Sequence, residues 1–332
     1  MPDNYGYINA RVRAMHSGLI TQKLDEAVSA SSYAEFLRLL SESAIGADLG
    51  EATASGAGLP QLDAALSKNF YNTAQKIVGM ADGASGRDIA LLFARYDVLN
   101  LKAVARGKIG GRSGEEIYAN LSPAGSLKPM VLQALANTAD VGNLAGVAGI
   151  NASPLAGAFR KAALQLTSDQ NLLEFEVALD QAYYQTIFKN ADSSTLKDYL
   201  RREIDGTNIL SALKLKASGA SSSLEKYFVK GGKEINPQQF EQIVAGSGGM
   251  ENLNAFARLS ESPDLGTAET NIRNIMLETA KKLYVSDALG IGVVIGFLKE
   301  KEQEVALARL IGRAKYYNVP TDVIKKEVGR GA

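Results

Sequence analysis

The sequence contains no cysteine, a single histidine and no apolar run long enough to cross a bilayer. The absence of cysteine excludes disulfide bonds, thiolate metal ligands and cysteine nucleophiles, and it fits a reducing compartment. The most apolar run, residues 288–298, is far shorter than the roughly 20 residues of a membrane-spanning helix. We expect this run to be the buried start of a helix. Residues 1–15 lack the apolar stretch of a signal peptide, so we expect a cytoplasmic protein.

Neither sign of charge is in excess, since 36 Lys and Arg residues balance 36 Asp and Glu residues. The chain therefore lacks the overall basic field with which nucleic-acid binders attract phosphates, and we expect no nucleic-acid partner. Hydrophobic residues make up 46% of the chain and charged residues 22%, as in ordinary folded proteins. A length of 332 residues allows two domains or three small ones.

The usual motifs of catalysis and metal binding are weak or absent. His16 has no second imidazole with which to form a metal site. The glycine-rich stretch 229–236 has Glu234 after its lysine, so we expect a turn and not a phosphate-binding loop. A Ser-x-x-Lys pattern occurs at Ser194/Lys197, Ser211/Lys214 and Ser223/Lys226. Repeated matches in a chain rich in Ser and Lys indicate that this pattern arises by chance. Taken together, these motifs lead us to expect no catalytic residue, no metal and no cofactor.

Helical periodicity dominates the chain. Apolar residues recur three and four positions apart over residues 32–44, 223–228 and 238–245, which predicts an all-α fold. Two glycine-rich stretches, 46–60 and 79–86, are predicted to be flexible loops. Ser113 precedes Glu115 and Glu116 and is expected to cap the start of a helix.

A sequence pattern near residue 100 recurs twice. Residues 95–111 and 202–219 carry similar sequences. Five matched pairs are each 108 positions apart, without a gap: Asp97/Asp205, Asn100/Asn208, Lys108/Lys216, Gly111/Gly219 and, farther along, Pro129/Pro237. A third copy, residues 301–318, follows the second at a spacing of 99 positions. It places Glu304 at the Asp position and Leu307 at the Asn position. The repeat predicts three similar helical-bundle domains in series, namely 1–112, 113–220 and 221–332.

Each copy is predicted to be a helix that ends in the same way. Gly111, Gly219 and Asn318 lie three positions after the repeated lysine, and Gly and Asn most readily adopt the left-handed conformation that ends a helix. Cations precede each stop: Arg106, Lys108, Lys214, Lys216, Arg313 and Lys315. They can complement the helix dipole, which is worth about 0.3–1 kcal/mol per group, or they can form a ring that contacts an acidic partner. Both interpretations stay open.

The repeated acidic and amide residues need partners outside their own helix. Asp97 and Asn100 lie on one helix face, but Lys108 is about 16 Å farther along the axis, at about 1.5 Å per residue. Asp97 and Lys108 therefore cannot pair within the helix. We expect the acidic residue and the Asn to form hydrogen bonds between helices or between domains.

Several longer stretches resemble one protein family, the C subunits of V-type and A-type rotary ATPases, known in eukaryotes as the d subunits. The resemblance covers nearly the whole chain and is carried by residues 5–15, 36–43, 95–116, 199–219, 228–235 and 288–320. The chain departs from the family at Leu307, at the glycine-rich stretch 46–60, and at 286–288, where the family often has a proline before Leu-Gly.

The resemblance implies a funnel-shaped protein of three similar helical domains around a pseudo-threefold axis with a central cavity. In such a protein the cavity receives the foot of the central shaft, made by the D and F subunits. The other end rests on the cytoplasmic face of the membrane rotor ring of proteolipid subunits. The protein transmits torque for ATP synthesis or for ion transport driven by ATP hydrolysis. It has no active site of its own.

Two alternatives belong to other functional classes. A freestanding helical-repeat adaptor that binds protein partners would expose an open concave groove, whereas the rotor coupling protein would close about an axis. An enzyme with a Ser/Lys nucleophile would lose activity when Ser211 and Ser223 are replaced by Ala.

Overall fold

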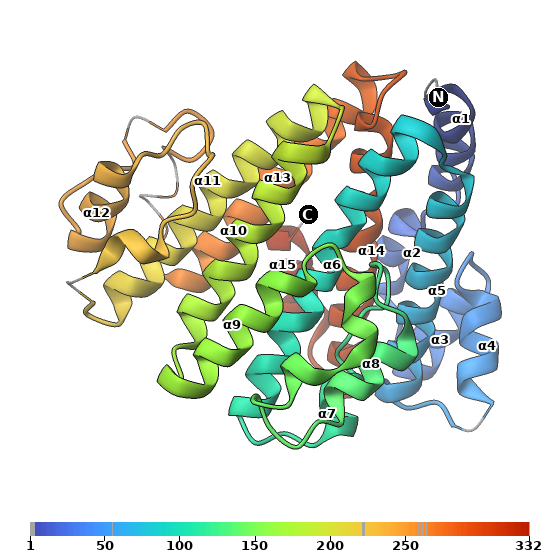
Figure 1. Ribbon diagram of the computed structural model, residues 1–332. Helices are drawn as coiled ribbons and strands as arrows, with labels where there is room; N and C mark the ends of the chain where they lie inside the picture. Colours follow the sequence, from blue (N-terminus) through green and yellow to red (C-terminus); the bar gives the residue numbers. More distant parts are fainter. Residues whose placement is uncertain are drawn as a thin grey trace. The chain divides into compact units, whose positions relative to one another are not determined.

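The structure is a computed structural model that describes residues 4–54, 56–220, 223–251, 253–257, 259, 262 and 264–331 (Figure 1). Within these ranges every regular element is a helix, which confirms the all-α prediction. The chain separates into two compact units. One, here called the central unit, is Gly83–Met276, and the other, the terminal unit, combines Pro2–Asp82 with Leu277–Ala332.

The central unit begins with a long helix and contains two further long helices. Its elements are α6 (Gly83–Ile109), α7 (Gly114–Tyr118), α8 (Pro129–Ala136), the short 3₁₀ helices η1 (Leu144–Gly146) and η2 (Ala148–Ala152), α9 (Ala156–Asp169), α10 (Leu172–Asn190), α11 (Ser194–Ala217), η3 (Leu224–Tyr227), α12 (Pro237–Ala245) and the first half of α13 (Leu265–Ser286). Helix α10 packs against α6, α9 and α11, while α12 packs against α11 (Figure 1).

The terminal unit joins segments that are far apart in the sequence. Its elements are α1 (Tyr5–His16), α2 (Thr21–Ala27), α3 (Tyr33–Ser41), α4 (Gly46–Thr53), α5 (Leu59–Met80), the second half of α13, α14 (Gly292–Tyr316) and α15 (Thr321–Gly331). Helix α14 packs against α1, α2, α3, α5 and α15 and so forms the centre of this unit. Residues 291–298 are buried at the start of α14, which confirms this part of the interpretation of the apolar run 288–298. The first residues of the run, Ala288 and Leu289, are exposed in the turn before α14.

The flexible loop predicted over residues 46–60 is wrong for most of its length, although residue 55 lies outside the described residues. Helix α4 occupies Gly46–Thr53, and α5 begins at Leu59. Leu49 is 2% exposed, and Asp48 accepts a hydrogen bond of 2.8 Å from the side chain of Asn69 on α5. Packing of this face against α5 outweighs the low helix propensity of the glycines.

Other local predictions have mixed outcomes. The stretch 79–86 is mostly helical, because only residues 81 and 82 separate α5 from α6. The helix predicted over 223–228 is the 3₁₀ helix η3. Ser113 caps α7 as expected, since its side chain accepts from the amide of Glu116 while Glu116 accepts from the amide of Ser113. The three domains bounded at residues 112 and 220 stay a prediction.

Candidate functional site: three repeated helix ends

The three repeated helices end with the same backbone geometry. The residues at the stops have positive φ angles, 67° at Gly111, 70° at Gly219 and 55° at Asn318. In each case the next amide donates back to a carbonyl five positions earlier, at 2.9 Å for Arg112, 3.1 Å for Ala220 and 2.8 Å for Val319. This pattern is the Schellman motif, which satisfies carbonyl groups at a helix C-terminus.

Asp97 and Asn100 on α6 bind the chain segment that follows this helix. Asp97 is fully buried and accepts from the amide of Leu127 at 3.1 Å, from the hydroxyl of Ser153 at 3.1 Å and from Ser126. Asn100 forms two hydrogen bonds with the backbone of Ser122, of 2.6 and 2.8 Å. The two side chains therefore fix the segment that leads into α8.

Asp205 and Asn208 on α11 do the same for the segment before α12. Asp205 is fully buried and accepts from the amides of 233, 234 and 235 at 3.0–3.1 Å. Asn208 forms two hydrogen bonds of 2.8 Å with the backbone of Val229. The stretch 229–236 is thus a turn, as predicted. Its amides donate hydrogen bonds to the carboxylate of Asp205 and do not form a phosphate-binding loop.

In the third copy the bound segment precedes its helix in the sequence. Glu304 on α14 is fully buried and accepts from the amide of Ile20, 284 positions away, and from Lys301. Ile20 directly precedes α2, and Leu127 and Ile235 each lie two residues before the start of α8 and α12. Residues 20–30 therefore take the place that 127–138 and 235–246 hold in the other copies. Leu307 is buried where the others have Asn, so this copy lacks the amide contact.

A glycine allows the backbone to approach the carboxylate in the first two copies. A Cβ atom at Gly125 would lie 2.1 Å from Oδ1 of Asp97, and one at Gly232 would lie 2.2 Å from Oδ1 of Asp205. Both separations are far inside van der Waals contact, so only glycine fits. Neither residue was predicted from the sequence, although each stands shortly before the repeated proline of Pro129 or Pro237.

The repeated lysines of the first and third copies bind carbonyl groups of the same segments. Lys108 donates to the carbonyl of Thr138, and Lys315 donates to the carbonyl of Ala30 at 2.6 Å. Lys315 is only 6% exposed. This geometry gives both lysines a role in holding the segment and leaves little of Lys315 for a partner.

Arg106 and Arg313 bind acidic residues on a neighbouring helix. Arg106 forms two hydrogen bonds with Glu176 on α10, of 2.5 and 2.7 Å. Arg313 binds Asp63 on α5 at 3.2 Å. Both arginine side chains remain more than half exposed, so each ion pair is worth at most about 1 kcal/mol.

Lys214 and Lys216 on α11 differ from their counterparts. Both are exposed, and within the described ranges neither forms an ion pair or a side-chain hydrogen bond. The ammonium group of Lys216 lies beside Gly246, at 3.1 Å from the place where a Cβ atom would stand. Of the six cations predicted to contact a partner, these two are the ones whose side chains bind no group among the described residues.

Burial raises the pKa of Asp97 and of Asp205, against the lowering effect of their hydrogen bonds. The cause is desolvation, which disfavours the charged form of a carboxyl group. The donors around each carboxylate compensate only part of that cost. We call the buried carboxylates of Asp97, Asp205 and Glu304 the carboxylate anchors. At Asp97 and Asp205, the loss of one hydrogen-bond donor leaves a poorly solvated charge.

The residues considered for catalysis lie in ordinary structural surroundings. His16 contacts Glu300 at 3.2 Å and stacks on Tyr284 at a ring distance of 4.7 Å. Ser211 is 7% exposed, whereas Lys214 is exposed. In the part of the chain that the structure describes, no group of three or more His, Asp or Glu side chains could hold a metal ion.

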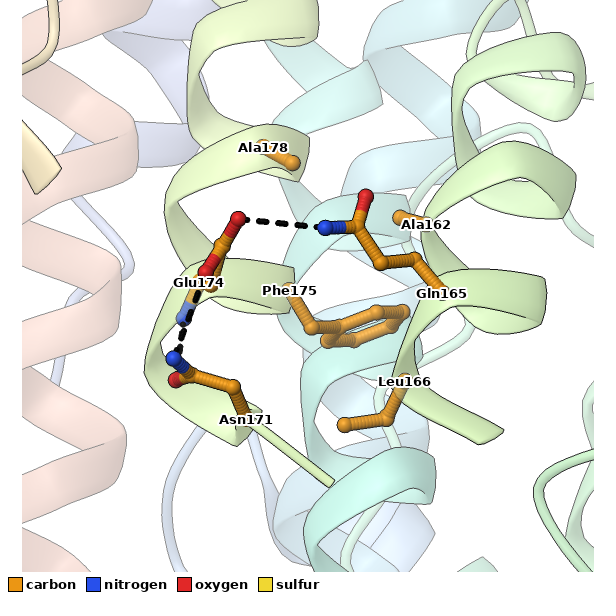
Figure 2. A pocket seen from close by; sticks show the side chains of 7 residues that line it. All are labelled: Ala162, Gln165, Leu166, Asn171, Glu174, Phe175 and Ala178. Carbon is orange, nitrogen blue, oxygen red and sulfur yellow. Dashed lines mark hydrogen bonds between the residues drawn. The ribbon is translucent and has the colours of Figure 1, made fainter. Parts of the chain in front are cut away.

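A small pocket lies between α9 and α10 (Figure 2). Glu174 in its wall accepts hydrogen bonds from Gln165 at 3.1 Å and from Asn171 at 3.2 Å, so these polar groups already bind one another (Figure 2). Pockets for small molecules usually measure about 300–1,000 Å³. This pocket is too small for such a ligand.

Comparisons with known proteins identify relatives along the whole chain. Residues 8–327 match the family described as ATP synthase (C/AC39) subunit. The C subunit of the V-type ATP synthase of Deinococcus radiodurans is 42% identical over 330 residues, which cover 99% of this chain and 92% of the relative. Its counterpart in Thermus thermophilus is 33% identical over 334 residues, which cover 99% of both chains.

A more distant relative is the C subunit of the A-type ATP synthase of Methanocaldococcus jannaschii. It is 25% identical over 341 residues, which cover 97% of this chain and 85% of the relative. These matches confirm the resemblance that the sequence stretches indicated. No helix among the described residues combines the length and the apolar character needed to span a membrane.

The two equivalent aspartates should respond differently to replacement by asparagine. In Asp205→Asn the new amide group meets backbone N–H donors only, so at least one buried donor loses its acceptor. We expect a loss of about 2–3 kcal/mol in the free energy of unfolding. In Asp97→Asn the hydroxyls of Ser126 and Ser153 can rotate to accept from the amide, so we expect a loss below about 1 kcal/mol. Urea denaturation measures both, and equal losses would contradict the assigned contacts.

The raised pKa of Asp97 should also appear in the pH dependence of stability. The folded state holds this proton more tightly than the unfolded state. The contribution of Asp97 is therefore fully present in acid and is lost as the pH rises from about 4 through the raised pKa. The variant Asp97→Asn lacks this loss, so wild type should become less stable relative to the variant as the pH rises. Urea denaturation between about pH 4 and 7 tests this, and a constant difference counts against it.

Proposed function

Because this chain belongs to the ATP synthase (C/AC39) subunit family, we propose that it is a non-catalytic component of the central stalk of a V-type or A-type ATPase. It joins the shaft made by the D and F subunits to the membrane rotor ring of proteolipid subunits. It transmits torque between them, for ATP synthesis or for ion transport driven by ATP hydrolysis. Its place is cytoplasmic and peripheral to the membrane, and it needs no cofactor.

The observation that carries this proposal is the set of three buried carboxylates, Asp97, Asp205 and Glu304, each at the same position of a repeated helix. They occur in a chain that matches the family over residues 8–327. A coupling part must pass rotation along with little internal shear. In each copy a buried carboxylate fixes the segment beside its helix through backbone amides. Such contacts resist sliding, because displacement of the segment leaves a buried charge without its donors.

The arrangement of the copies is part of the proposal. Three similar domains around a pseudo-threefold axis would form a funnel with a central cavity for the shaft. The boundaries at residues 112 and 220 give the first approximation of these domains. The contact of Glu304 with Ile20 favours a revision, in which residues 20–30 complete the third copy.

Lys214 and Lys216 are the partner contacts that we propose. Their counterparts Arg106, Lys108, Arg313 and Lys315 bind groups of the chain itself. Lys214 and Lys216 are exposed and form no ion pair or side-chain hydrogen bond among the described residues. Carboxylates on the shaft or on the ring are the matching chemistry. A freestanding adaptor is not favoured, because the family match spans nearly the whole chain.

The proposal is tested by binding measurements with purified partners. The wild-type chain should bind the complex of the D and F subunits, and it should also bind detergent-solubilised proteolipid rings. The double variant Lys214→Glu, Lys216→Glu should weaken one of these two interactions by at least about tenfold, because like charges then oppose each other at the contact. Surface plasmon resonance at two salt concentrations measures the change.

A matched control is Lys161→Glu with Lys189→Glu, which reverses two exposed lysines on α9 and α10. This variant should bind both partners as wild type does. Thermal unfolding should be nearly unchanged in both double variants. If wild type binds neither partner, the proposed function is wrong. If the α11 variant binds as wild type does, its lysines serve only the helix dipole.

A further inference from the structure

The turn between α13 and α14 exposes two large aliphatic side chains. Leu289 is 81% exposed and Val285 is 75% exposed, and the neighbouring Ala288 is exposed too. We call Val285, Ala288 and Leu289 the apolar tip. Figure 1 shows the turn in orange, at the end of the terminal unit where α1 begins. Exposure of adjacent aliphatic side chains to water is unfavourable and indicates an interaction site.

The apolar tip stands on a rigid base. The side chain of Asn9 on α1 donates to the carbonyls of Ala288 and Gly290, at 3.1 and 2.9 Å. Asp287 turns inward and accepts from the amide of Gly292 at 2.9 Å. Ile291, directly after the turn, is fully buried. The backbone of the turn is thus held in place, which lowers the entropy cost of any binding that uses it.

Cations surround the base of the apolar tip. Lys281 and Lys282 are exposed on α13, about one helical turn before Val285. Arg13 on α1 donates to the carbonyl of Tyr284 at 3.2 Å, and its guanidinium lies 4.8 Å from the centre of the Tyr284 ring. We call Arg13, Lys281 and Lys282 the basic shoulder. Glu278 is a nearby carboxylate that pairs with it, through Lys281 at 3.2 Å.

We propose that the apolar tip and the basic shoulder form a docking site for an anionic lipid surface. The aliphatic side chains enter the boundary between headgroups and acyl chains, where interfacial segments bury about 5–10 Å of their apolar face. The cations lie about 5 Å behind them, at the depth of the lipid phosphates. The flexible stems of the two lysines allow their charges to reach these phosphates.

A protein partner fits these features less well. Lysine is depleted at protein interfaces, whereas lysines beside an apolar tip are typical of peripheral membrane contacts. Two aliphatic side chains on a projecting turn also provide far less than the roughly 800 Å² per partner of a standard protein interface. The inference does not depend on the proposed function, because the chain alone can be tested against lipid.

The first test is co-sedimentation of the full chain with vesicles. The chain should sediment with phosphatidylcholine vesicles that contain phosphatidylglycerol and much less with phosphatidylcholine alone. The double variant Val285→Ser, Leu289→Ser should lower the partition coefficient at least about tenfold, because the aliphatic groups lose their transfer free energy. The double variant Lys281→Gln, Lys282→Gln should lower it about tenfold and reduce its dependence on salt.

Met130→Ser is the matched control, since Met130 is a 78% exposed side chain in the central unit, on α8. This variant should bind vesicles as wild type does. Circular dichroism should show all variants folded, because the replaced side chains are exposed.

A second test uses the absence of cysteine. The variant Ser286→Cys carries a unique thiol in the turn, to which a polarity-sensitive fluorophore can be attached. Its emission should shift to shorter wavelength with anionic vesicles. The shift should disappear when Leu289→Ser is added, and a label on Met130→Cys should show no shift.

Three results would overturn the inference: no sedimentation of wild type with anionic vesicles, equal sedimentation of the Val285→Ser, Leu289→Ser variant, or no shift of the label in the turn. If that double variant keeps vesicle binding but loses binding to detergent-solubilised rings, the turn is a protein contact and the lipid site is refuted. Failure of vesicle binding leaves the interaction with the shaft and the ring unaffected, so the two proposals are separable.

Discussion

The structure depends on a buried carboxylate that accepts hydrogen bonds from the backbone of a neighbouring segment. Asp97, Asp205 and Glu304 are fully buried, and an unpaired charge in such a place is costly. The amides before α8, α12 and α2 supply the donors. Each long helix therefore fixes the segment beside it, and glycine at 125 and 232 allows the backbone to come close enough. This contact explains why the three copies share one sequence pattern.

The third copy shows how the contact relates to the organisation of the chain. Its carboxylate binds Ile20, so the terminal unit is closed by residues from opposite parts of the sequence. The lysine contact follows the same rule. Lys315 donates to the carbonyl of Ala30, which comes before its helix in the sequence, whereas Lys108 donates to the carbonyl of Thr138, which comes after its helix. A unit closed by hydrogen bonds between distant segments resists opening at either segment. That property suits the proposed role in the transmission of torque.

Local patterns predicted much of the fold. The long helices, their glycine or asparagine stops and the Ser113 cap follow from periodicity and from left-handed propensity. The loop predicted over 46–60 was wrong, because the burial of Leu49 against α5 is not visible in local composition. The sequence excluded a pair between Asp97 and Lys108 but could not identify Leu127 or Ile20, since neither donor has a distinctive side chain. All six cations look equivalent in the sequence, and only their contacts separate Lys214 and Lys216 from the rest.

The rigidity of the three anchors links the family to the proposed transmission of torque. The most direct test is amide hydrogen exchange at Ile20, Leu127 and Ile235, followed by nuclear magnetic resonance or by mass spectrometry of short peptides. If the buried carboxylates hold the segments, the three amides should exchange only when the surrounding unit unfolds. Exchange of these amides as fast as that of exposed loop residues would contradict this role of the carboxylates.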